Sequence, residues 1–413
     1  MSCRGKTLGL STMGSLVLLQ MCCSLLALTG PVPLDQTNHT QASPNKIRLA
    51  LTRDINFDKG GQLRAPEVSY FTEIGVGAPA KMFKLAIDTS FDKIWLPGYN
   101  GMPFANNLHY SKGYSGSSTG RSLPKQIKFE YRGTILTGNV HQDVFNLYGM
   151  DRRDQKASGQ VSYLQRYLTV NSASDEQFRS KPYDGVLGLR STPVPDFGLA
   201  WKCFLLGSTD ERDLYSSNPR GRRIDVCDYP NESVYALWFN PDQDSPNGGE
   251  LMLGGVDESR FTGEISYHDC DTVIEWAVAV WSVHLGDKVV SCEKGCTATV
   301  DSGSNLMFGP IRDVAQIYAQ LNANHWIDNG FWTVDCNRLD ELPSLVFKID
   351  ETLYPISPRQ YTRKFYHHDN PICQLLIEAR YSSDWALGTS FLGAHYSVFD
   401  FKNRRVGLAT PRA

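Results

Sequence analysis

Residues 86–97 read AIDTSFDKIWLP. Two apolar residues precede an aspartate, and two small hydroxyl residues that favour a turn follow it. A matching segment, TVDSGSNLMFGP, occupies residues 299–310. In both copies an aromatic residue stands seven positions after the aspartate, and a proline stands nine positions after it. A fainter echo follows each copy, VLG at 186–188 and ALG at 386–388. This internal repeat predicts two lobes of similar design.

The residue pattern of the rest of the chain is typical of an all-β protein. Short runs rich in Val, Ile, Tyr, Phe and Thr are separated by turn residues at intervals of about ten residues, the spacing of strands and turns. Helical periodicity is scarce, and residues 312–323 carry its best example. The 413 residues are 41% hydrophobic and 21% charged, which is typical of a folded protein long enough for two domains. The formal net charge of -3 gives no footprint for nucleic acid or for an anionic membrane.

The N-terminus indicates a secretory route. Two basic residues precede an apolar run from Leu8 to Leu28, which predicts a signal peptide over residues 1–28. The alternative is a membrane anchor, but the strongly apolar core is short for a bilayer span. Two glycosylation acceptors, Asn38 and Asn231, agree with secretion. We therefore expect an extracellular, lysosomal or digestive destination, with no membrane attachment after signal removal.

The repeated aspartates predict a catalytic pair. If an approximate twofold axis relates the lobes, the two loops meet and the carboxyl groups of Asp88 and Asp301 become neighbours. Close carboxylates share one proton, so one partner can take a proton from water while the other donates to an amide carbonyl oxygen. This hydrolysis of a peptide bond needs no metal and no cofactor. The alternative is that each Asp-hydroxyl pair only caps a turn, but the matched copies favour catalysis.

Six segments, in order along the chain, carry a resemblance to a known family. They are YFTEIGVGAPAKMFKLAIDT (70–89), FEYRGTILTG (129–138), YDGVLGL (183–189), GGELMLGGVDESRFTGEISY (248–267), SCEKGCTATVDSGS (291–304) and FLGAHYSVFDFKNRRVGLA (391–409). They resemble the pepsin-like aspartic proteases of the A1 family from about Tyr70 to the C-terminus. The second segment is similar to the flap hairpin of that family, and the fifth to its second catalytic loop.

The resemblance implies an all-β, bilobal fold with short helices and an active-site cleft between the lobes. Four parts are expected along the chain: a signal peptide (1–28), a propeptide (29–65), an N-terminal lobe (66–235) with the first catalytic aspartate and the flap, and a C-terminal lobe (236–413) with the second. The resemblance also implies a monomer that cleaves polypeptide substrates and has its own propeptide as inhibitor. Within that propeptide, Lys46 or Arg48 could neutralise the paired carboxylates until acid protonates them.

The resemblance also assigns roles to single residues. Asp88 and Asp301 are the catalytic pair, Tyr131 is the flap tyrosine that closes over substrate, and Trp95 supports that tyrosine. The other candidates are Thr89 and Ser302, whose hydroxyl groups can brace one catalytic loop against the other, and the substrate-binding residues Thr134, Gly303 and Ser304. The alternative for Tyr131 is an ordinary cross-strand aromatic, because Arg132 stands where the family has glycine. Arg132 could also bias the cleft toward acidic side chains.

The cysteines after the signal segment number seven. Two pairings resemble family disulfides, and a third would close a polar insertion that the family pattern does not explain. The expected pairs are Cys292 with Cys296, Cys336 with Cys373, and Cys203 with Cys227. Cys270 is then left over, either as a free buried thiol or as half of an intermolecular bridge. In an oxidising compartment the close Cys pair is a disulfide rather than a metal site.

The first catalytic loop departs from the family pattern. The family has Thr-Gly-Ser after the first aspartate, whereas this chain has Thr89, Ser90 and Phe91. Ser90 adds a hydroxyl that could donate to a carboxylate, whereas Phe91 removes one, and a lost donor to the charged form raises a carboxyl pKa. We therefore expect slow catalysis or a shifted pH optimum. The alternative function is a catalytically weak or inactive binding protein with the pepsin fold.

A serine hydrolase is a weaker alternative. GSSTG at residues 116–120 formally satisfies the nucleophile motif of such enzymes. That motif requires a strand before the serine and a helix after it, and the polar loop around this copy has neither pattern.

Overall fold

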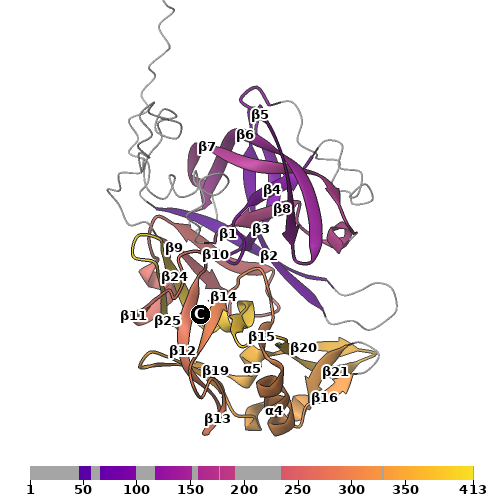
Figure 1. Cartoon of the computed structure of the whole chain (residues 1–413), viewed down its shortest axis with the longest axis vertical. Coiled ribbons are helices and arrows are strands. Elements are labelled where there is room, and N and C mark those ends of the chain that lie inside the picture. The colour runs from indigo at the N-terminus through magenta and orange to yellow at the C-terminus, as the bar shows by residue number, and fades with distance from the viewer. Residues whose placement is uncertain are drawn as a thin grey trace, which may run out of the picture. The chain divides into compact units, whose positions relative to one another are not determined.

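Strands form most of the described chain, with few and short helices (Figure 1). The computed structural model describes residues 46–56, 66–98, 117–150, 157–175, 177–190, 234–326 and 330–412. The all-β expectation is therefore confirmed. The signal peptide, both glycosylation acceptors and the Cys203–Cys227 pair lie outside the described residues.

The largest sheet has thirteen strands in the described ranges and joins both halves of the sequence. In spatial order they are β11 (Phe261–Asp269), β25 (Arg405–Pro411), β24 (Tyr396–Asp400), β9 (Val234–Phe239), β10 (Asn247–Leu253), β1 (Ile47–Asn56), β2 (Glu67–Val76), β3 (Lys81–Asp88), β8 (Gly185–Gly188), β4 (Ile94–Pro97), β7 (Ala157–Ala173), β6 (Thr134–Met150) and β5 (Arg121–Tyr131). The flap hairpin expected at residues 129–138 is the β5–β6 connection.

Two smaller sheets belong to the second half of the chain. One runs β19 (Thr352–Ile356), β18 (Leu345–Ile349), β12 (Ala277–Leu285), β14 (Cys296–Val300), β23 (Trp385–Leu387), β15 (Met307–Pro310) and β22 (Ile377–Arg380), with β13 (Lys288–Ser291) beside β12. The other runs β16 (Asn324–Trp326), β17 (Phe331–Val334), β21 (Asn370–Leu375) and β20 (Thr362–His367).

The described helices are α4 (Ile311–Leu321), α5 (Pro358–Tyr361) and α6 (Thr389–Leu392), with short 3₁₀ turns η3 (Gln177–Ser180), η4 (Glu258–Arg260) and η5 (Cys336–Glu341). Helix α4 is the one expected from periodicity at 312–323. It buries Val314, Ile317, Tyr318 and Leu321, the three- and four-residue spacing of one helix face.

The internal repeat corresponds to a repeated arrangement of strands. In the first copy β8 lies between β3 and β4, parallel to β3 and antiparallel to β4. In the second copy β23 lies between β14 and β15 with the same two orientations. The VLG and ALG segments correspond to the middle strands β8 and β23. The sequence repeat is therefore confirmed as a structural repeat.

Strand β1 has a place in the fold that the expected propeptide role of residues 29–65 did not predict. It pairs antiparallel with β10 on one side and with β2 on the other. Ile47, Leu49 and Leu51 alternate into the core and are at most 4% exposed, as the two-residue period of a strand requires. The candidate inhibitory segment is therefore an integral strand of the largest sheet.

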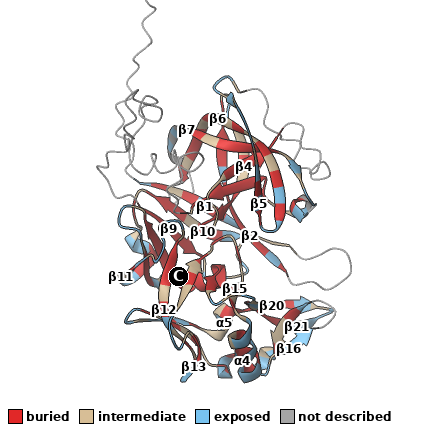
Figure 2. Ribbon diagram, viewed as in Figure 1, coloured by how far each residue is buried: buried red, intermediate tan, exposed pale blue. Residues whose placement is uncertain are grey.

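Buried residues follow the strands of the sheets (Figure 2). Trp95, Trp276 and Trp385 are completely buried.

Two of the expected disulfides are present, Cys292–Cys296 and Cys336–Cys373. Cys270 is free and half-buried, and burial raises the pKa of its thiol to about 11, so the thiol stays protonated and unreactive at neutral pH.

Candidate active site

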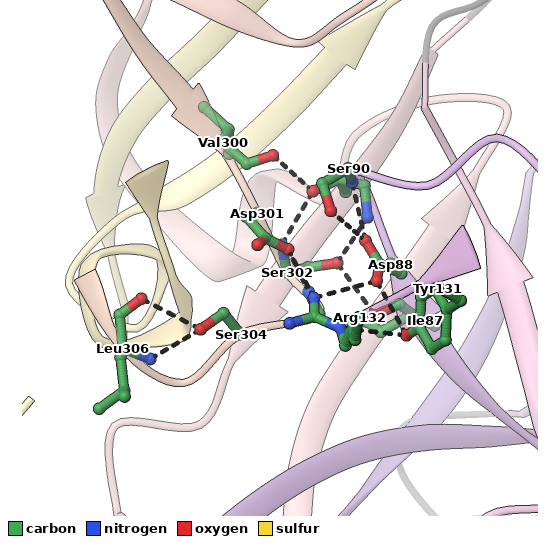
Figure 3. A network of polar contacts seen from close by, with 12 residues as sticks. Ile87, Asp88, Ser90, Tyr131, Arg132, Val300, Asp301, Ser302, Ser304 and Leu306 are labelled. Atoms are coloured by element: carbon green, nitrogen blue, oxygen red, sulfur yellow. Dashed lines mark hydrogen bonds and ion pairs between the residues drawn. The ribbon is translucent and has the colours of Figure 1, made fainter. Parts of the chain in front are cut away.

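The two repeated loops meet and hold each other through an exchange of hydrogen bonds. The backbone N–H of Thr89 donates to Oγ of Ser302 over 3.0 Å, and the N–H of Ser302 donates to Oγ1 of Thr89 over 2.9 Å. Each hydroxyl then donates across to the other loop, Thr89 to the carbonyl of Val300 and Ser302 to the carbonyl of Ile87 (Figure 3). Four bonds therefore fix the two strand ends together.

This brace brings Asp88 and Asp301 to one place. Asp88 ends β3 and is completely buried, whereas Asp301 follows β14 directly. Oδ1 of Asp88 accepts from both the N–H and the hydroxyl of Ser90, over 2.9 and 2.7 Å. Oδ1 of Asp301 accepts from the N–H of Gly303 over 3.0 Å. The hydroxyl donor that Phe91 removes is thus supplied by Ser90.

Arg132 lies between the two carboxylates. Its Nη2 is 3.0 Å from Oδ2 of Asp88 and 3.1 Å from Oδ1 of Asp301 (Figure 3). The hydroxyl of Tyr131 also donates to Oδ2 of Asp88 over 2.9 Å. The sequence analysis singled out Arg132 but did not predict that it contacts both aspartates. The feature that could have indicated this contact is a cation next to Tyr131, at a position where the family has glycine.

The geometry of the flap turn directs Arg132 toward the pair. Arg132 and Gly133 join β5 to β6 as a two-residue turn, with φ of +50° and +83°. Two positive φ angles are typical of the type I′ hairpin turn. A non-glycine residue in this region costs roughly 1–2 kcal/mol, and the two ion pairs of Arg132 offset that cost.

An aromatic cluster packs the β5–β6 hairpin, the expected flap, against the loop that follows Asp88. The ring centroid of Tyr131 is 4.6 Å from that of Phe91, 5.7 Å from that of Phe178 and 6.2 Å from that of Trp95. Phe91 also lies 6.0 Å from Phe129 of the flap. The buried Nε1 of Trp95 has no hydrogen-bond partner among the described residues. Phe91 therefore adds an apolar contact that keeps the flap closed.

Burial and charge set the protonation of the pair. Burial raises the pKa of Asp301, and nearby Asp88 raises it further, while Arg132 acts in the opposite direction. Burial, with the charge of Asp88, also holds the pKa of Tyr131 well above its ordinary value, so its hydroxyl remains a donor. Burial disfavours the charge on Arg132, but Tyr131 and the two aspartates outweigh it and raise the pKa of Arg132.

A cavity of about 270 Å³ adjoins the pair. Four expected site residues line it, namely Tyr131, Ser302, Gly303 and Ser304, together with Arg132. Thr134 is placed elsewhere: it is completely buried, and its hydroxyl donates to Asp175 over 2.8 Å. The expectation that Thr134 contacts substrate is therefore not supported by its position, because the short flap turn directs its side chain inward.

The expectation for Lys46 and Arg48 is wrong in this conformation. Arg48 pairs with Asp257 at 2.6 Å and with Glu250 at 3.3 Å, and Lys46 donates to the carbonyl of Val256. Pairing of Arg48 with Met252 of β10 and these polar contacts hold both side chains on residues 250–257 rather than on Asp88 and Asp301. Arg132 of the flap supplies the neutralising cation instead.

The described ranges contain neither a membrane-spanning helix nor a cluster of metal ligands. No helix there is long and apolar enough to cross a membrane. No group of three or more His, Cys, Asp or Glu side chains there could hold a metal ion.

Comparison with known proteins identifies the family. The model of the eukaryotic aspartyl proteases matches residues 69–411. The chain therefore belongs to this family of pepsin-like A1 proteases. It is 30% identical to cathepsin E-B of Xenopus laevis over 349 residues, which cover 83% of this chain and 79% of that protein. It is 26% identical to pregnancy-associated glycoprotein 2 of Bos taurus (83% and 82% covered) and 25% identical to human cathepsin D (83% and 81% covered).

Proposed function

We propose that this protein is an aspartic endopeptidase in which Asp88 and Asp301 activate a water molecule. The observation that carries the proposal is the position of Nη2 of Arg132, within 3.1 Å of a carboxylate oxygen of each aspartate. A single small donor at that point satisfies both carboxylates at hydrogen-bond distance. When Arg132 moves away, a water molecule can take the same place.

The chemistry follows from one shared proton. Because burial raises the pKa of Asp301, we assign the shared proton to Asp301 and the role of base to Asp88. Asp88 takes a proton from the water, the water oxygen attacks the carbonyl carbon, and Asp301 donates its proton to the carbonyl oxygen. Asp88 then transfers its proton to the amide nitrogen, and Asp301 takes a proton back from a hydroxyl of the tetrahedral intermediate. The C–N bond breaks, the carbonyl re-forms and two peptides are released with the dyad in its starting state.

Arg132 makes the proposed enzyme latent in the conformation described. Its guanidinium occupies the place of the catalytic water and attracts both carboxylates. Protonation of Asp301 in acid removes one of its two ion pairs and loosens the flap. We infer an enzyme that is weakly active near neutral pH and more active in acid.

The proposed processing and location rest on the sequence. A signal peptide over 1–28, a propeptide over 29–65 and lobes divided near residue 235 remain predictions, as do glycosylation, a secretory route and a monomeric state. The burial of β1 within the largest sheet supports a propeptide that stabilises the precursor.

Digestion of an unfolded protein substrate between pH 2 and 7 tests the proposal. The wild type should cleave it in acid, and a folded Asp301→Asn variant should not. The second candidate is a catalytically inactive binding protein, in which Arg132 occupies the dyad permanently. If neither the wild type nor a folded Arg132→Gly variant cleaves the substrate at any pH, the enzyme proposal fails and the binding protein stands.

A further inference from the structure

Arg363 is a buried cation whose side chain has no partner among the described residues. It lies on β20, opposite Gln374 of β21, and is 4% exposed. Within the described ranges its side chain makes no hydrogen bond and no ion pair, and its Nε is fully covered and unsatisfied. Burial lowers the pKa of Arg363, while Asp244 attracts its charge without forming an ion pair. Arginine nevertheless stays protonated in proteins, so a positive charge is present.

A second buried arginine lies beside it. Arg53 of β1 is also 4% exposed. Its guanidinium donates to the hydroxyl of Tyr70 over 3.0 Å and to the carbonyls of Asn240 and Ser245 over 2.6 and 3.1 Å. These neutral acceptors satisfy its hydrogen bonds but bring no negative charge. Two guanidinium groups therefore share one region without a contacting carboxylate among the described residues.

Both arginines line a small cavity of about 40 Å³. Ser390 of α6 lines it too; it is 6% exposed, and its Oγ has no hydrogen-bond partner within the described part of the chain. The cavity can hold a small ion, because on the same measure one water molecule needs roughly 10–15 Å³. Tyr70, Asn305 and Thr389 line both this cavity and the larger one beside the catalytic pair.

We propose that this cavity is a binding site for a small monovalent anion, held by Arg363 and the hydroxyl of Ser390. A buried charge is strongly disfavoured unless a counter-charge and hydrogen bonds compensate it. A halide ion or a carboxylate accepts from both a guanidinium and a hydroxyl, and either fits the volume. Chloride is one such anion available in solvent, and a small free carboxylate such as acetate is the other. The site is independent of the catalytic chemistry proposed above.

Thermal unfolding of the full chain at pH 6.5 and constant ionic strength tests the site. Sodium chloride, bromide or acetate would replace sodium gluconate, whose anion is too large for the cavity. The apparent Tm of the wild type should rise by about 1–3 °C as the site fills. A rise with the halides identifies a halide site, and a rise with acetate alone identifies a carboxylate site.

Arg363→Met is the matched variant, because it keeps an unbranched side chain and removes the charge. Its Tm should not respond to the choice of anion, and in gluconate it should melt no lower than the wild type, since an uncompensated charge has gone. Equal responses of the two proteins would overturn the proposal. Ser390→Ala, which should weaken the response, gives a second test if the Met variant fails to fold.

Crystals grown in sodium bromide give an independent readout. Anomalous density between the Arg363 guanidinium and Oγ of Ser390 is expected. Density for water alone at that position, with no response of the Tm to halide or acetate, would contradict the site.

Discussion

Arg132 neutralises the proposed catalytic pair in this conformation. Its guanidinium contacts both aspartates, and its backbone takes a left-handed turn position that glycine adopts without strain. Replacement by glycine should therefore keep the turn and free the pair.

We predict that Arg132→Gly raises kcat/KM at pH 6–7 by at least about tenfold, which corresponds to about 1.4 kcal/mol of transition-state stabilisation. Arg132 acts to lower the pKa of Asp301, so its removal should also move the neutral limb of the activity profile to higher pH. Peptide hydrolysis from pH 3 to 8 measures both effects. Arg132→Lys, which keeps a cation, is the control; an unchanged profile for the glycine variant would argue against the latch.

Phe91 is the second residue with a defined consequence. It packs against Tyr131 and Phe129 of the flap, and aromatic pairs contribute about 0.5–1.5 kcal/mol beyond their buried area. We predict that Phe91→Ser loosens the flap, with faster amide hydrogen exchange at residues 129–136 and a loss of about 1–3 kcal/mol in the free energy of unfolding. Unchanged exchange in the flap would show that Phe91 does not hold it.

At the scale of elements, a glycine ends β8 and another directly follows β23, and in each case backbone atoms of the repeated loop lie close to it. A Cβ on Gly388 would collide with the backbone carbonyl oxygens of Leu306 and Ser304. A Cβ on Gly188 would collide with those of Phe91 and Lys93. Backbone atoms fixed in a sheet have little freedom to move aside.

We predict that Gly388→Ala destabilises the protein by about 1–3 kcal/mol and lowers activity by displacing the second catalytic loop. Chemical denaturation and the acid digest measure the two effects. The matched control is Gly393→Ala, where the nearest atom to the new Cβ is the Thr389 carbonyl oxygen at 3.0 Å. Equal losses for both variants would contradict a special role for the strand crossing.

Sequence patterns predicted these elements unequally. The flap hairpin and helix α4 have local signals, a glycine-containing turn and a helical period, and both lie where expected. Strand β1 was expected only as a basic inhibitory segment. Its central place in the sheet depends on β10, nearly 200 residues later in the sequence, and no local pattern specifies such a pairing.

At the scale of the whole molecule, the meeting of the two loops makes stability depend on pH. The raised pKa of Asp301 favours its protonated form in the folded state. Its stabilising contribution is therefore complete below the unfolded pKa of about 3.9 and is lost as the pH rises through the raised folded value.

We predict that the Tm of the wild type falls relative to that of Asp301→Asn as the pH rises from 3.5 to 7, because the variant has no carboxyl group to ionise. Paired melting curves across this range measure the difference. Replacement of an exposed acid, Asp287→Asn, is the control and should not reproduce the trend. A difference that stays constant with pH would contradict the raised pKa.

The sequence alone determined the class of fold, the pairing of Asp88 with Asp301 and the exchange between Thr89 and Ser302. The repeat predicts this pairing without a structure, because two similar segments fold into similar loops and a twofold relation between the lobes brings those loops together. The tertiary structure decided which cation neutralises the pair. Arg132 is 44 residues from Asp88 and 169 residues from Asp301 in the sequence, and its guanidinium reaches both carboxylates only because the β5–β6 hairpin packs over the two loops.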